Sequence, residues 1–327
     1  MPNPDSIMLW KALKGIICVY KPAEISVKNL RKTLITKLCN DLSELDVKLR
    51  YPMPESITNN SDSTSLARQA TEISLTTNQS ITKSLDLRYH PLVIGPRYRD
   101  EDLFVSWSNY LGWNTSGVLL FGLRRGTQVA KFIRENRSTR AYRINGVFGK
   151  ATDNGFQTGK VVEKSTWKYI KHVHIQRILS SMQASHQKKM YEACGVDLNS
   201  QLAYDLAVKG PIRPVDSKIP IIYGLKCIDY EGPSFTIEVQ CINENEIYLT
   251  NLIQEIGLKL HSTAHTRTIK CIRHSCFTLE HALLQKHWNL HNITENMDKC
   301  NRLLVENEEI VNQSSPVLRK GRLAPVP

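Results

Sequence analysis

The densest run of basic side chains in this sequence lies between residues 124 and 143, with a single tyrosine, Tyr142, near its end. Guanidinium and ammonium groups at this density can track the phosphates of a nucleic acid. The same run can also be the solvated face of a helix and a strand, with Tyr142 as a core aromatic. Both interpretations stay open from these residues alone. The basic residues are Arg124, Arg125, Lys131, Arg134, Arg137, Arg140 and Arg143.

The charge of the whole chain favours a polyanionic partner. The 327 residues include 43 Lys and Arg against 31 Asp and Glu, which gives a net charge of +12. Basic proteins bind nucleic acids through phosphate contacts and the release of counterions. A hydrophobic content of 41% argues against wholesale disorder, and the longest apolar runs have only the length of a strand, so no membrane span is expected. Protein partners cannot be read from the composition.

The eight cysteines indicate neither a disulfide framework nor a metal site. Cys271, His274 and Cys276 are close in sequence, but they lie in or beside an expected strand and have no second cysteine pair. We expect reduced thiols, no bound metal and no cofactor. The first 14 residues contain Lys11 and Lys14 but no arginine, so they make a weak mitochondrial presequence and leave the localisation open.

Hydrophobic periodicity predicts strands in groups of two or three with helices between them. This order is typical of an α+β fold with a mixed, mainly antiparallel sheet flanked by helices. The expected strands are Gly15–Tyr20, Gly117–Leu123, Thr139–Phe148, Ile221–Tyr230, Phe235–Cys241 and Ala264–Ile272. The expected helices follow an N-cap at Ser26, begin at Thr127 and Leu279, and span Ile175–Met182, Asn199–Lys209, Glu246–Leu260 and Ile293–Asn312.

The composition divides the chain into three parts. Residues 1–14 are expected to be an N-terminal extension and residues 15–290 a single domain. Serine, threonine and asparagine dominate residues 52–86 without an apolar period, so this stretch is predicted to be a flexible insertion in that domain. Residues 291–327 are predicted to form a charged helix and a disordered basic tail.

Four segments carry a resemblance to a known family, and they come in the family's order. Together with a weaker fifth segment, Tyr248–Gly257, they extend from about residue 15 to residue 285. The pattern resembles the TruB family of RNA pseudouridine synthases. The long polar insertion, and the lack of room for a C-terminal PUA domain, are similar to the branch associated with mitochondria. The four segments are Gly15–Pro22, Leu111–Gly122, Arg140–Tyr142 with Gly149–Asp153, and Ala203–Gly210.

The resemblance implies a pseudouridine synthase-like fold, a site and a substrate. The family breaks the glycosidic bond of uridine, rotates the base and re-forms the bond through carbon, after flipping the nucleotide onto an aromatic ring. The two family tyrosines fall on Tyr142 and Tyr248. The resemblance also implies tRNA or mitochondrial RNA as the partner, a mitochondrial location, and RNA contacts by Lys21 and the basic run.

Two residues of the family's reaction centre are missing. The nucleophilic aspartate falls on Gly112, and the arginine that pairs with it falls on Thr250. A buried arginine without its carboxylate would be an unpaired charge, so the two losses belong together. We therefore expect an RNA-binding protein with impaired catalysis. The alternative is an active RNA pseudouridine synthase in which another carboxylate substitutes, and the candidates are Asp100, Glu101, Asp102 and Asp153.

Overall fold

The computed structural model describes residues 6–50, 98–210, 212–213 and 218–308, with only the backbone of residues 46–50. The predicted insertion at 52–86 therefore lies outside the described residues, as does the predicted basic tail after residue 308.

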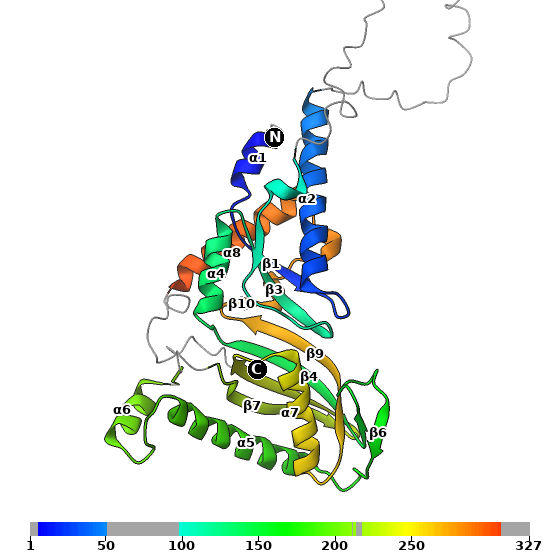
Figure 1. Ribbon diagram of the computed structural model, residues 1–327, viewed down its shortest axis with the longest axis vertical. Coiled ribbons are helices and arrows are strands. Elements are labelled where there is room, and N and C mark those ends of the chain that lie inside the picture. Colours follow the sequence, from blue (N-terminus) through cyan, green and yellow to red (C-terminus); the bar gives the residue numbers. More distant parts are fainter. Residues whose placement is uncertain (1–5, 51–97, 211, 214–217, 309–327) are drawn as a thin grey trace, which may run out of the picture.

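One mixed sheet organises the described part of the chain (Figure 1). Its strands follow the order β1-β3-β9-β4-β8-β7. In addition, β2 pairs with β3, and β10 pairs with β9. β3 and β9 run parallel, and the other neighbours run antiparallel. The predicted α+β class with a mixed, mainly antiparallel sheet is confirmed. The strands are β1 (Gly15–Lys21), β2 (Val105–Trp107), β3 (Thr115–Leu123), β4 (Arg140–Phe148), β7 (Ile221–Glu231), β8 (Ser234–Ile242), β9 (Ala264–His274) and β10 (Phe277–Thr278).

The helices pack against different strands of the sheet. α4 and α8 contact β1, α5 contacts β7, and α7 contacts β9. The predicted N-cap is confirmed, because Ser26 Oγ accepts a hydrogen bond from the Asn29 amide at the start of α2. No helix in the described ranges is both long and apolar enough to cross a membrane. The helices are α1 (Ser6–Ala12), α2 (Val27–Arg50), α4 (Gly126–Glu135), α5 (His172–Ala193), α6 (Gln201–Lys209), α7 (Glu246–Lys259) and α8 (Leu290–Glu306).

The helix predicted from Leu279 is wrong. A 3₁₀ turn forms over Leu279–His281, and a second one forms over Gln285–His287 before α8 begins. Between the two turns the chain is extended, and the amide of Leu283 donates to the Cys18 carbonyl at 2.9 Å while the Leu283 carbonyl accepts from Tyr20. Leu283 thus satisfies the open edge of β1, a long-range pairing that overrides the local helical pattern. Between β4 and α5 the chain forms a small hairpin of β5 (Lys150–Thr152) and β6 (Val161–Lys164).

Two irregularities in the sheet position the segments that matter for function. Gly117 in β3 has φ of +119°, and a Cβ atom there would lie 2.1 Å from the Cys271 carbonyl oxygen of β9. Only glycine permits this close crossing of the two strands. The pairing of β4 with β9 shifts register between Ala141 and Tyr142, and such a shift turns the following side chain to a new direction. The loop before β3 and the side chain of Tyr142 are thereby fixed to the same part of the sheet.

Candidate active site

Gly112 lies in the loop that leads into β3, and its surroundings are filled. A Cβ atom at Gly112 would lie 2.2 Å from Oε2 and 2.3 Å from Cδ of Glu246. These separations are far below van der Waals contact, so the Glu246 side chain occupies the space that a side chain at position 112 would need. A carboxylate from another element therefore fills the space at the position where the resemblance predicts the family aspartate.

Glu246 is the first residue of α7, and the sequence folds to hold it there. The Asn245 side chain caps the helix by accepting a hydrogen bond from the Tyr248 amide at 2.7 Å. Thr115 Oγ1, at the start of β3, donates to Glu246 Oε2 at 2.6 Å. A carboxylate in the first turn is also favoured by the helix dipole. Strand β3 and helix α7 are thus joined at this carboxylate.

Lys21 is fully buried at the end of β1 rather than exposed to bind phosphate. Its Nζ donates to the carbonyl of Thr115 at 2.7 Å, to that of Pro22 at 3.1 Å and to that of Trp113 at 3.2 Å. Burial lowers the pKa of Lys21 to about 8, and the nearby Glu246 carboxylate opposes this shift. Lys21 fastens the loop after Gly112 to β1 and places a positive charge near Glu246.

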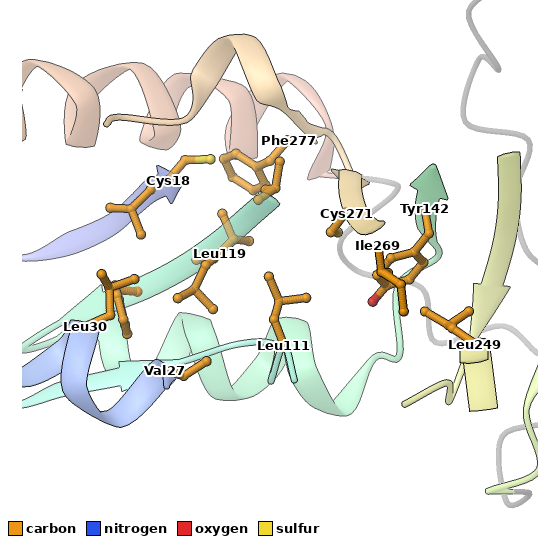
Figure 2. Close-up of a cluster of buried hydrophobic side chains, with 14 of the residues drawn as sticks. Cys18, Val27, Leu30, Leu111, Leu119, Tyr142, Leu249, Ile269, Cys271 and Phe277 are labelled. Atoms are coloured by element: carbon orange, nitrogen blue, oxygen red, sulfur yellow. The ribbon is translucent and has the colours of Figure 1, made fainter. Parts of the chain in front are cut away.

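Tyr142 lies in the core and belongs to a buried polar group. Its ring packs in the same cluster as Leu249 of α7 and Ile269 of β9 (Figure 2), and the residue is only 3% exposed. The hydroxyl donates to Glu244 Oε1 at 2.6 Å, and the same oxygen lies 2.6 Å from Arg140 Nε. Burial raises the pKa of Tyr142, as does the Glu244 carboxylate, while Arg140 acts in the opposite direction.

Thr250 and Tyr248 both lie on α7 but face different neighbours. Thr250 is buried, and its hydroxyl donates to the carbonyls of Ile247 and Glu246 within the helix. The turn at Gly155 packs against it, because a Cβ atom at Gly155 would lie 3.3 Å from the Thr250 Cβ. The Tyr248 hydroxyl instead lies 3.2 Å from His186 Nε2 on α5. Burial raises the pKa of Tyr248.

Three of the four carboxylates considered as substitutes from the sequence have other hydrogen-bond partners, and the fourth, Glu101, is exposed in the same 3₁₀ turn as Asp100 and Asp102. Asp100 accepts from the Thr36 hydroxyl on α2, and Asp102 accepts from the Arg99 amide. Asp153 accepts from the Asn154 and Lys160 amides of its own turn. The sequence interpretation missed both Glu244 and Glu246. One signal was available for Glu246: it precedes Thr250 by four residues, so the two share a face of α7.

The basic run divides into exposed and interior residues. Arg140 is bound to Glu244, and Arg124 donates to the Trp10 carbonyl at 2.6 Å while its guanidinium lies over the Trp10 ring. Arg137 is half-buried. The exposed members of the run are Arg125, Lys131, Arg134 and Arg143.

Comparisons with known proteins place the chain in a family. Residues 106–247 match the family model described as the TruB family pseudouridylate synthase N-terminal domain. The protein called pseudouridylate synthase TRUB2, mitochondrial, is 33% identical in Xenopus tropicalis, over 89% of this chain and 87% of that protein. The human protein of the same name is 34% identical, over 86% of this chain and 82% of its own length.

Among solved structures, an archaeal box H/ACA sRNP Nop10–Cbf5 complex aligns with a TM-score of 0.41 and 13% identity, over 95% of this chain and 59% of that chain. The TRUB2 relatives exceed 30% identity over most of both chains, and the motif around Gly112 lies inside the matched family domain. The chain belongs to the TruB family of pseudouridylate synthases.

Proposed function

We propose that this chain binds RNA through its TruB-family domain and isomerises uridine at a strongly impaired rate. The observation that carries the proposal is the reaction centre itself. Gly112 offers no side-chain atom, and Thr250 offers a hydroxyl that is bonded within its own helix. The oriented aspartate–arginine pair implied by the family is therefore missing, while the fold that holds it is present.

RNA binding is supported by charge that the fold leaves at the surface. The net charge of +12 favours a polyanion. Lys131 and Arg134 are exposed on α4, and the C-terminal end of α4 leads directly into β4, which carries Tyr142. An RNA strand whose phosphates follow α4 would bring one of its nucleotides towards the candidate site. The relatives named TRUB2 are called mitochondrial, so we propose tRNA or mitochondrial RNA as the partner and mitochondria as the location.

Charge reversal at Lys131 and Arg134 is expected to weaken RNA binding. Each phosphate contact that is lost should reduce the slope of log affinity against log salt by about 0.9, so the double change to Glu should flatten it by roughly 2. Affinity at moderate salt should fall by about tenfold or more. Titration of the full chain into unmodified tRNA and mitochondrial mRNA transcripts, at several salt concentrations, measures both quantities.

A matched control exists on α8. Lys299 and Arg302 have the same spacing, both are exposed, and Lys299 pairs with Glu295 within its helix as Lys131 pairs with Glu135. Changing Lys299 and Arg302 to Glu alters the net charge equally but away from α4. Equal losses in both double variants would mean that net charge alone binds RNA and that the α4 surface is not the contact.

A further inference from the structure

The carboxylate of Glu246 fills the space beside Gly112 that the first atoms of a side chain at position 112 would need. The carboxylate of an aspartate begins one bond beyond Cβ, and a Cβ atom at Gly112 would be 2.3 Å from Glu246 Cδ. The two groups would therefore compete for one volume. The loss of the side chain at 112 has not left an empty pocket, because a group of the same chemistry has entered from α7.

Neighbouring groups on three elements hold this carboxylate in place. Thr115, which is buried in the first position of β3, donates a short hydrogen bond of 2.6 Å to Oε2. The N-terminal end of α7 favours negative charge at Glu246. The buried ammonium of Lys21 adds an attraction, since Glu246 partly offsets the effect of burial on the pKa of Lys21. These three contributions come from β3, α7 and β1, which meet at this point.

The second carboxylate oxygen is available for chemistry. Within the described residues, Thr115 is the hydrogen-bond partner of the Glu246 carboxylate and binds only Oε2. Oε1 accepts no hydrogen bond there, and the residue is half-exposed. A carboxylate held by one oxygen and open at the other is suited to attack or to stabilise a positive centre.

We propose that Glu246 replaces the absent aspartate as the carboxylate of the reaction centre, and that the slow isomerisation by this chain depends on it. The proposal rests on the proposed function, because it assigns the impaired activity to a residue. Oε1 of Glu246 attacks C1′ of the flipped uridine, and the C1′–N1 bond breaks with its electron pair passing to the uracil. After rotation, C5 attacks C1′ and the carboxylate leaves. The C5 proton is lost and N1 takes up a proton, so nothing is consumed.

The same geometry explains why the rate stays low. Thr250 supplies no guanidinium to orient the carboxylate. The Lys21 ammonium cannot do so either, because it donates its three hydrogen bonds to backbone carbonyls. Glutamate is also longer than aspartate by one methylene and reaches the site from a different element. Misplacement of a reacting group by about 1 Å lowers a rate by roughly a hundredfold.

The first test replaces Glu246 with its uncharged isostere. The full chain, in excess over a pool of unmodified tRNA and mitochondrial mRNA transcripts, is followed for pseudouridine by mass spectrometry under single-turnover conditions. Glu246→Gln keeps the size of the side chain and an acceptor for Thr115. It should lower the first-order rate by about 100-fold or more, with RNA affinity and melting temperature unchanged. Glu255→Gln, on the exposed face of the same helix, is the matched control and should keep the native rate.

The second test moves the carboxylate from position 246 on α7 to position 112 on the loop before β3. Glu246→Gly should be as inactive as Glu246→Gln. Adding Gly112→Asp to Glu246→Gly returns a carboxylate to the same volume from the other side, and the rate should recover to at least the native value. A role of Glu246 confined to the first turn of α7 would give no such rescue, because the relocated carboxylate lies on the loop before β3 and the helix cap at Asn245 stays the same in both variants.

The outcomes separate this inference from the proposed function. Native rates in Glu246→Gln would overturn the role of Glu246 and leave the proposed function intact. No pseudouridine from the native chain in single turnover would overturn both the role of Glu246 and the slow isomerisation, while RNA binding would stand. Absence of RNA binding by the native chain would overturn the proposed function instead. A rate lost in Glu246→Gln and recovered in the relocated variant supports both.

Discussion

A chain carrying Gly112→Asp, Thr250→Arg and Glu246→Gly is expected to form pseudouridine at least about 100-fold faster than the native chain. The aspartate regains its position on the loop before β3, and the arginine returns to the buried face of α7 that Thr250 occupies. Glu246 must leave as well, because its Oε2 lies 2.2 Å from the Cβ that the aspartate brings. Multiple-turnover assays with the same transcript pool measure the gain.

Two companion variants make this prediction specific. Gly112→Asp with Thr250→Arg, and with Glu246 retained, should gain little, since two carboxylates would share one volume and repel each other. Gly112→Asn in place of the aspartate in the triple variant should stay slow, because the amide keeps the shape without the charge. If the double variant forms pseudouridine as fast as the triple variant, Glu246 does not obstruct the aspartate at position 112. If the native chain already turns over many equivalents of RNA, the impaired rate is refuted.

Glu244→Ala is expected to destabilise the protein more than the loss of any surface charge. The Glu244 side chain is fully buried between Arg140 and Tyr142, so its removal leaves a guanidinium in the interior without a carboxylate. Breaking one side of such a pair costs about 3–5 kcal/mol. For a domain of this size the melting temperature should fall by roughly 10 °C. Thermal unfolding of the native protein and of the Glu244→Ala variant measures the difference in melting temperature.

The control for Glu244 lies on the neighbouring strand. Glu238 of β8 pairs with Arg143 at 3.7 Å, and the Arg143 side chain is 52% exposed. Glu238→Ala should change stability by less than about 1 kcal/mol. Replacing Arg140 and Glu244 together with methionine should recover much of the loss, because no lone charge remains. A melting temperature for Glu244→Ala within about 2 °C of native would show that the pair contributes little.

The sheet and most helices could be predicted because their patterns are local. Strict alternation of apolar residues marks Phe235–Cys241 as a half-buried strand, and β8 forms there. The segment after Leu279 carried an equally local pattern, yet the hydrogen bonds of Leu283 to β1 decide its conformation. The partners of Leu283 lie more than 260 residues earlier, and no window of sequence contains both.

The candidate site likewise has parts that local motifs predict and parts that only long-range contacts determine. The family resemblance predicts the place of the nucleophile from the Leu111–Gly122 segment and the place of the arginine from the Tyr248–Gly257 segment. Neither motif shows that Glu246 reaches Thr115, because this contact joins residues 131 positions apart. The burial of Lys21 was missed for a related reason. A lysine before a proline at a strand end is usually solvated. The interior position of Lys21 is tolerable because its ammonium donates to the carbonyls of Pro22, Trp113 and Thr115, and the last two lie far away in sequence.

The place of β9 in the sheet has a consequence for the order of assembly during synthesis. β3 and β4 follow one another in the chain, but β9 lies between them and pairs with both. Until β9 emerges, the strands form two separate groups, β1-β3 with β2 and β4-β8-β7. Thr115 belongs to one group and Tyr142 to the other. The strand that carries Thr115 and the strand that carries Tyr142 therefore join one sheet only when this late strand is inserted, so we expect the candidate site to be one of the last parts of the nascent protein to form.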